Sequence, residues 1–184
     1  MVTLFRVGAG LAPALLLFLV ALAEAGQIKV TYVRTDGSYG NCTYVEFPNG
    51  KNMLMDGGGS SAATNLLTTF LDSKIGAGGT IWYMVLSHPH TDHFNGLLSA
   101  LARYQVMYVY DGQFDPGNGY ATFNTNANAE PGAVRYLPAP TATTDDVVSG
   151  TGVTMGPGWD PDVTARILHC NNSTADPNAR SIFL

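Results

Sequence analysis

The sequence of 184 residues contains few charged residues and few histidines or cysteines. Charged residues make up 12% of it and the formal net charge is -5, which argues against a basic protein that coats nucleic acid. A strongly acidic tail is absent as well. Because 46% of the residues are hydrophobic, the chain is not wholly disordered. The 21 glycines and 10 prolines follow no period, which excludes collagen-like and solenoid repeats and predicts one domain of short elements.

No apolar run long enough to cross a membrane follows residue 25. The first 25 residues have the pattern of an export signal, with Arg6 before the apolar run Leu11–Leu22 and small residues at the cleavage position Ala23-Glu24-Ala25. The run is shorter than the roughly 20 residues that a membrane-spanning helix needs. We therefore expect cleavage near Ala25, a secreted or periplasmic product without a stable membrane anchor, and one domain over residues 26–184.

The chain has only two cysteines, Cys42 and Cys170. An exported protein can form a disulfide bond between such residues. Two buried, reduced cysteines agree with the sequence equally well, because nothing in it fixes the distance between them.

Hydrophobic patterning predicts a domain that opens with an antiparallel meander. Alternating apolar and polar residues predict a strand over 27–33. The Asn49-Gly50 pair predicts a hairpin turn between strands over 42–47 and 52–55. The uninterrupted apolar run 81–86 is typical of a central strand that is covered on both faces.

Two helices are expected on either side of this central strand. The first follows Ser60 or Ser61 and places Leu66, Leu67, Phe70 and Leu71 on one face, and the second begins near His93. The Gly- and Asn-rich segment 111–130 shows little periodicity and is predicted to be a long surface loop. Further short strands are predicted over 106–110, 134–137, 153–155, 163–168 and 180–184.

A dense group of metal-binding residues follows the central strand: His88-Pro89-His90-Thr91-Asp92-His93 holds three of the four histidines. Open α/β sheets bind ligands at this end of their strands. In an extended loop, residues two apart point the same way, so His88 and His90 can bind one metal ion. Asp92 and His93, where the chain turns into a helix, can hold a second ion. Zn²⁺ suits these ligands, and iron and manganese are also compatible; incidental histidines in a solvated loop are the alternative.

This motif resembles the signature of the metallo-β-lactamase superfamily of metallo-hydrolases. The similarity includes Tyr83–Ser87 before the motif and Phe94–Gly96 after it. Residues 28–59 are similar to the opening strands of the branch that includes the extracellular domain of the DNA-uptake protein ComEC, and residues 177–184 resemble a later strand of that branch. The resemblance implies an αββα sandwich of the α/β (α+β) class, with two mixed sheets inside, helices outside and metals at one edge, here truncated at its C-terminus.

The resemblance also implies two divalent metal ions, with zinc as the expected element. In the family, the first His pair and a later His bind one ion, the Asp-His pair and a further His bind the other, and a later Asp bridges them. His169 is the only other histidine and a possible third ligand, and no later Gly-Asp step matches the bridging residue. Asp56, before three glycines, is a candidate to orient a ligating His by accepting its other ring N–H; a turn former or helix cap is the alternative.

These expectations combine into an exported metal-dependent hydrolase. Water activated by the metals attacks an ester, amide or phosphodiester bond, and Asp92 acts as the catalytic residue that binds metal and orients this water. The ComEC-like resemblance favours a phosphodiester, including nucleic acid, although the negative charge of the chain argues against the latter; a small molecule is the other substrate class. The alternative is a catalytically silent, secreted metal-binding or interaction protein derived from such a hydrolase.

Overall fold

The computed structural model describes residues 26–34, 40–59, 61–111, 117, 119–136, 146–147, 160, 163 and 166–167. Several expectations therefore lie outside the described residues: the export signal, the strands over 153–155 and 180–184, and the candidate residues His169 and Cys170. Within the described part, no helix is long and apolar enough to cross a membrane. Cys42 is buried and carries a free thiol.

The chain opens with the predicted antiparallel meander of β1 (Lys29–Tyr32), β2 (Thr43–Glu46) and β3 (Asn52–Met55). The hairpin between β2 and β3 turns through Asn49 and Gly50, as expected from the sequence. The Asn49 side chain accepts a hydrogen bond from the backbone N–H of Lys51 at 3.0 Å, and Gly50 adopts φ 79°. An Asx turn followed by a left-handed glycine is what this dipeptide favours.

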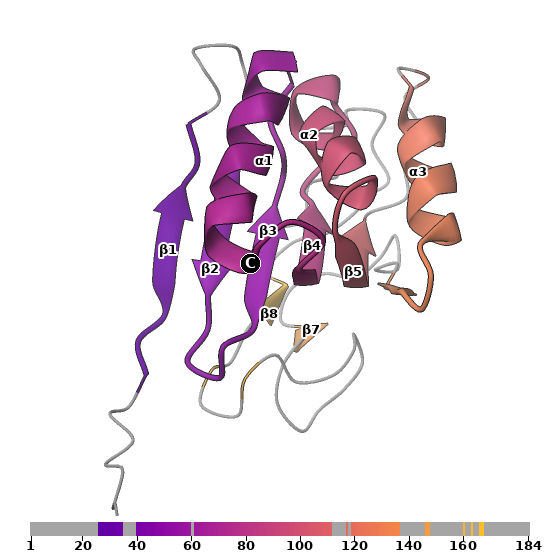
Figure 1. Cartoon of the computed structure of the whole chain (residues 1–184). Coiled ribbons are helices and arrows are strands. Elements are labelled where there is room, and N and C mark those ends of the chain that lie inside the picture. The colour runs from indigo at the N-terminus through magenta and orange to yellow at the C-terminus, as the bar shows by residue number, and fades with distance from the viewer. Residues whose placement is uncertain are drawn as a thin grey trace, which may run out of the picture.

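Three parallel strands continue the same sheet: β4 (Thr80–Leu86), β5 (Gln105–Asp111) and β6 (Val134–Tyr136). Each of them is preceded by a helix: α1 (Ser61–Ile75) leads from β3 to β4, α2 (Thr91–Leu101) from β4 to β5, and α3 (Tyr120–Ala129) from β5 to β6. The six strands lie in sequence order, and right-handed crossovers between successive parallel strands put all helices on one face. Figure 1 shows the three helices side by side in front of the sheet. The fold is thus a mixed α/β sheet of six strands with three helices.

Outside this sheet, the described residues contain one short antiparallel pair, β7 (Asp146–Val147) with β8 (Arg166–Ile167), and an isolated antiparallel bridge between Asp160 and Val163. β6 and β8 fall within the segments 134–137 and 163–168 that were predicted as strands. β7 lies in a segment for which no strand was predicted.

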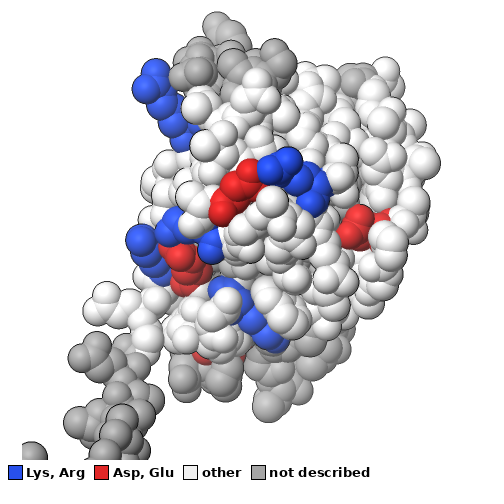
Figure 2. All heavy atoms as spheres, viewed as in Figure 1, with Lys and Arg blue, Asp and Glu red and all other residues white. Residues whose placement is uncertain are grey.

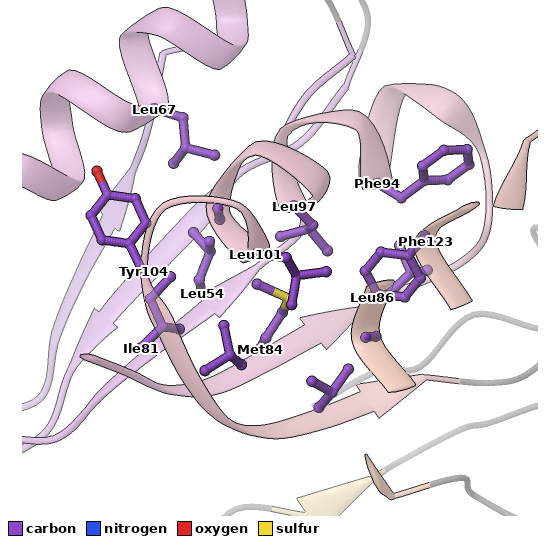
Figure 3. Close-up of a cluster of buried hydrophobic side chains, with 14 of the residues drawn as sticks. Leu54, Leu67, Ile81, Met84, Leu86, Phe94, Leu97, Leu101, Tyr104 and Phe123 are labelled. Carbon is purple, nitrogen blue, oxygen red and sulfur yellow. The ribbon is translucent and has the colours of Figure 1, made fainter. Parts of the chain in front are cut away.

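The two faces of the sheet carry different side chains. On the helix-covered face, aliphatic residues such as Leu54 of β3 and Met84 of β4 lie in one buried cluster with Leu97 of α2, and all three are fully buried (Figure 3). The opposite face carries a row of aromatic rings. Tyr83 stacks on Tyr108 with centroids 5.6 Å apart, and the neighbouring strands repeat this arrangement with Tyr110 and Tyr136. As predicted, β4 lies between two apolar layers and is buried from Tyr83 to Leu86.

Two sequence expectations about helices need correction. The segment 111–130 is not a long loop, because α3 occupies half of it. Its buried residues Tyr120, Phe123 and Ala127 lie three and four positions apart and so share one helix face. In α1, Leu67 and Leu71 are buried, whereas Leu66 is 36% exposed, because it lies about 100° around the helix axis from Leu67. The second helix, α2, begins at Thr91, which agrees with the expected start near His93.

Candidate metal centre

The predicted metal-binding motif spans the end of a buried strand, a short loop and the first turn of a helix. β4 ends at Leu86, His88 and His90 stand in the loop, and α2 begins at Thr91 with His90 as its N-cap residue. His93 is buried on the first turn, whereas the Asp92 side chain is 34% exposed. The structure therefore brings all four predicted ligands to the carboxyl edge of the sheet.

The first two histidines face each other. Nε2 of His88 lies 3.2 Å from Nδ1 of His90. Two nitrogens bound to one tetrahedral zinc ion at about 2.0–2.1 Å lie about 3.3 Å apart. The spacing of this pair and its two imidazole nitrogens fit a single ion.

The second pair lies directly beside the first. Oδ2 of Asp92 is 3.6 Å from Nε2 of His93, which is within reach of one ion bound at about 2.0–2.2 Å from each atom. The rings of His93 and His88 have centroids 3.9 Å apart, so the two pairs form one continuous group. Carboxylate and imidazole together suit zinc, iron or manganese.

Each pair contributes two donors. Within the residues that the structure describes, no group of three or more His, Cys, Asp or Glu side chains is arranged to hold a metal ion. Catalytic zinc sites use three protein ligands. The four motif residues thus form two half-sites, and the predicted third ligand, His169, lies outside the described part of the chain.

Asp56 is the buried carboxylate behind this group. It follows β3 in a left-handed conformation with φ 58°, which Asp tolerates better than most residues. Its Oδ1 accepts the backbone N–H of Ser87 at 2.8 Å, and its Oδ2 lies 2.6 Å from Oγ of Ser87. Oδ2 also lies 2.7 Å from Nδ1 of His93. A ring N–H at Nδ1 can therefore donate to Asp56 while Nε2 faces Asp92.

Burial and neighbouring charges separate the pKa values of the two adjacent histidines. Burial, followed by repulsion from His93, lowers the pKa of His88 to about 4. Burial also opposes the charged form of His93, but its hydrogen bond to Asp56 and the negative charges of Asp56 and Asp92 outweigh it and raise the pKa of His93. At neutral pH the His88 imidazole is therefore neutral, the form in which histidine binds metal.

Glycines hold the first turn of α2 against the loop after β3. A Cβ on Gly96 would collide with the carbonyl group of Gly57, and a Cβ on Gly59 would stand 2.6 Å from Cα of Asp92. Two backbone hydrogen bonds tie the same segments together, from Gly57 N–H to the His93 carbonyl at 2.7 Å and from Gly96 N–H to the Gly58 carbonyl at 3.0 Å. This contact of backbone with backbone fixes the position of Asp92, and only glycine allows it.

Sequence reasoning did not single out Ser87 or these glycine contacts. Ser87 directly follows the buried strand and precedes the first ligand, a position that in retrospect marks it as a neighbour of the site. Gly96 stands three residues after His93, one helical turn further along the same face. Its partner Gly57 is 39 residues away in sequence, which no local pattern indicates.

The sheet, its helix-covered face and the histidine-rich strand end define a mixed α/β domain with a candidate metal site at the carboxyl edge of the sheet. A family model described as Metallo-beta-lactamase superfamily matches residues 35–165, which is most of the chain. The chain belongs to the metallo-β-lactamase superfamily, whose members are mostly metal-dependent hydrolases. A search of the curated proteins gave no match.

Proposed function

We propose that this protein is an exported metal-dependent hydrolase, acting in the secreted or periplasmic space on an ester, amide or phosphodiester bond. The observation that carries the proposal is the side-by-side arrangement of two donor pairs, His88 with His90 and Asp92 with His93, at the carboxyl edge of a buried strand. Membership of a superfamily of metal-dependent hydrolases supports it.

Each donor pair would hold one divalent ion, and zinc is the expected element. When bound, the ions supply a nucleophilic water at neutral pH and polarisation of the bond under attack. His169 is the candidate third ligand of the ion held by His88 and His90. Asp56 keeps a proton on Nδ1 of His93, so that Nε2 of this ring is directed to the second ion.

Asp92 is the proposed catalytic residue. Its side chain is 34% exposed, against 8% for its partner His93. A carboxylate with one oxygen near the ion and access to solvent can accept a hydrogen bond from the attacking water and hold it in line with the bond to be broken. Gly59 lies so close to Asp92 that a Cβ at this position would stand 2.6 Å from the Cα of Asp92.

The surface charge bears on the substrate class. Figure 2 shows few charged side chains on the viewed face, with positive and negative groups next to one another. The pairs include Lys74 with Glu46 at 2.8 Å and Arg103 with Asp72. Attraction of a phosphodiester would therefore depend on the bound cations, which dominate the local potential in such sites. The ComEC-like resemblance favours a phosphodiester bond as the target, either in a nucleic acid or in a small molecule.

A second candidate function rests on the donor count. Two donors for each ion within the described residues are fewer than a catalytic zinc site uses. On that ground the competing proposal is a catalytically silent, secreted metal-binding or interaction protein derived from such a hydrolase.

The test combines metal content with hydrolysis. The full chain, purified without chelators, would be analysed for zinc by mass spectrometry and assayed with bis(p-nitrophenyl) phosphate, p-nitrophenyl acetate and nitrocefin. The expected result is two ions per chain and hydrolysis of one substrate class, both reduced in His88→Ala and Asp92→Asn. Metal binding without hydrolysis would support the silent protein, and failure to bind any divalent metal would overturn both proposals.

A further inference from the structure

Ser87 is a buried residue between the central strand and the first ligand, and its hydroxyl contacts three polar side chains at once. Oγ lies 2.6 Å from Oδ2 of Asp56, 3.1 Å from Nδ1 of His88 and 3.2 Å from Nδ1 of His93. We propose that Ser87 is a positioning residue that links Asp56 to His88 and thereby selects the ring nitrogen with which His88 binds metal. This inference rests on the metal-binding function proposed above.

The direction of these hydrogen bonds follows from the number of protons available. An ionised carboxylate only accepts hydrogen bonds, and a serine hydroxyl has one proton to donate. The shortest contact of Oγ is to Asp56, so the hydroxyl proton points to the carboxylate, and Oγ acts as an acceptor toward His88. Nδ1 of His88 must then carry the ring proton.

The consequence for His88 is a fixed tautomer. A neutral imidazole carries one N–H, so a proton on Nδ1 leaves Nε2 as the only lone pair. Nε2 is the atom that faces Nδ1 of His90 at 3.2 Å, where the proposed ion would bind. Without the hydroxyl, both tautomers of His88 become available and the ring loses a contact that holds its orientation.

The two adjacent histidines therefore reach the same carboxylate by different routes. His93 contacts Oδ2 of Asp56 directly at 2.7 Å, whereas His88 reaches it through the hydroxyl of Ser87. The backbone N–H of Ser87 has its own bond to Oδ1, so removing the hydroxyl leaves the link between the loop and Asp56 in place. Loss of the hydroxyl should weaken the ion at His88 and His90 more than the ion at Asp92 and His93.

The experiment is a zinc competition titration of the full-length protein with a chromophoric chelator, repeated with Co²⁺ to record the absorption spectrum of each site. Three variants are compared with the wild type: Ser87→Ala, Ser87→Thr and the control Ser73→Ala, which removes a hydroxyl on the exposed side of α1 that bonds the Phe70 carbonyl. We expect Ser87→Ala to weaken one of the two sites by about 10- to 100-fold. Ser87→Thr, which keeps the hydroxyl, should restore the affinity, and Ser73→Ala should match the wild type.

Two further measurements separate a positioning role from a structural one. In a His90→Ala background, Ser87→Ala should cause no further change at the remaining site, because the ion that depends on Ser87 is already lost. If Ser87→Ala does not fold, Ser87→Cys carries the same test, because a thiol fills similar space but is a weak acceptor. Equal weakening of both sites without rescue by Ser87→Thr would overturn the inference.

The failure of this inference is distinguishable from the failure of the proposed function. A wild-type protein that binds no metal contradicts the proposed function. A wild-type protein that binds two ions, together with unchanged affinities in Ser87→Ala, contradicts only the role of Ser87.

Discussion

Two buried aspartates stand at the ends of the strands on either side of β4, and their surroundings are very different. Asp56 follows β3 and Asp111 is the last residue of β5; they are 3% and 1% exposed. The partners of Asp56 are a serine, a backbone N–H and a histidine. Asp111 instead accepts hydrogen bonds from the Tyr120 hydroxyl and from the Arg135 guanidinium, the latter at 2.6 Å.

The partners decide what each carboxylate does. An arginine guanidinium does not deprotonate in proteins, and the second terminal nitrogen of Arg135 reaches Asn124 and Asn128 on α3. The Asp111 group therefore ties β5, β6 and α3 together permanently. Among the partners of Asp56, the His93 imidazole can gain or lose a proton, and this ring faces the proposed metal centre. A buried acid at the carboxyl edge of a sheet is thus not by itself a mark of a functional site; the chemistry of its partners distinguishes the two cases.

The largest effect that would test this comparison is on stability. Asp111→Ala leaves the Arg135 guanidinium buried without its carboxylate, and breaking such a pair costs about 3–5 kcal/mol. Urea unfolding should show a loss of this size, while zinc bound per folded molecule stays unchanged. A loss of zinc binding with stability intact would contradict the assignment of Asp111 to the scaffold.

Asp56→Asn should mainly reduce zinc affinity, with a smaller effect on stability. The amide cannot accept all the hydrogen bonds that the carboxylate receives, so His93 and Ser87 lose their common partner. Zinc affinity should fall about 10- to 100-fold, with a smaller loss of unfolding free energy than in Asp111→Ala. Chelator competition and urea unfolding on the same preparations measure both quantities, and an unchanged zinc affinity would remove Asp56 from the site.

The close approach of Gly59 to Asp92 provides a further test of which residues belong to the metal centre. In Gly59→Ala the new methyl group would stand 2.6 Å from Cα and 2.9 Å from Cβ of Asp92 and displace this residue. We expect the affinity for one of two zinc ions to fall roughly tenfold. The control is Gly117→Ala, where φ is +78° but no atom lies within 4 Å of the new Cβ. The control should lose about 1 kcal/mol of stability or somewhat more and keep both ions; equal zinc binding in the two variants would contradict the prediction.

Asp72 on the exposed side of α1 provides a third carboxylate for comparison. Hydrogen bonds from Arg103 and Tyr104, in this order, lower the pKa of Asp72. Because the folded pKa lies below the unfolded one, the stabilisation is present above about pH 4 and is lost as the pH falls through the folded value. The Tm difference between wild type and Asp72→Asn should therefore shrink on acidification. The effect should be small because exposed ion pairs contribute little, and a pH-independent difference would contradict it.

The smallest predicted effect is on the thiol of Cys42. Burial, and then the negative charge of Asp56, raise the pKa of Cys42 to about 12. Alkylation of this thiol at pH 8, followed by peptide mass spectrometry, should be slow in the native protein and modestly faster in Asp56→Asn. Asp111→Asn should not change the rate, because Asp111 is not among the causes of the raised pKa. Equal rates in wild type and Asp56→Asn would show that the charge of Asp56 does not reach the thiol.

Much of the scaffold follows from local patterns. The Asn49-Gly50 turn, the apolar run of β4 and the position of the histidine motif after it are all present in the structure as expected. The helix α3 was missed because its apolar face consists of only Tyr120, Phe123 and Ala127 among polar residues. Its place in the fold depends on the distant partners of Tyr120, namely Asp111 and Arg135.

The sequence by itself determined the types of ligand and their order, because alternation in a loop and the turn into a helix are local properties of a few residues. Only the tertiary structure decided which nitrogen of each histidine is available, because that depends on Asp56 and Ser87, which are 31 residues apart. The same holds for Gly57 and Gly96, whose contact fixes α2 against the loop after β3. Hydrogen bonds and close packing act over a few ångströms in space, and the parallel sheet brings these segments within that range.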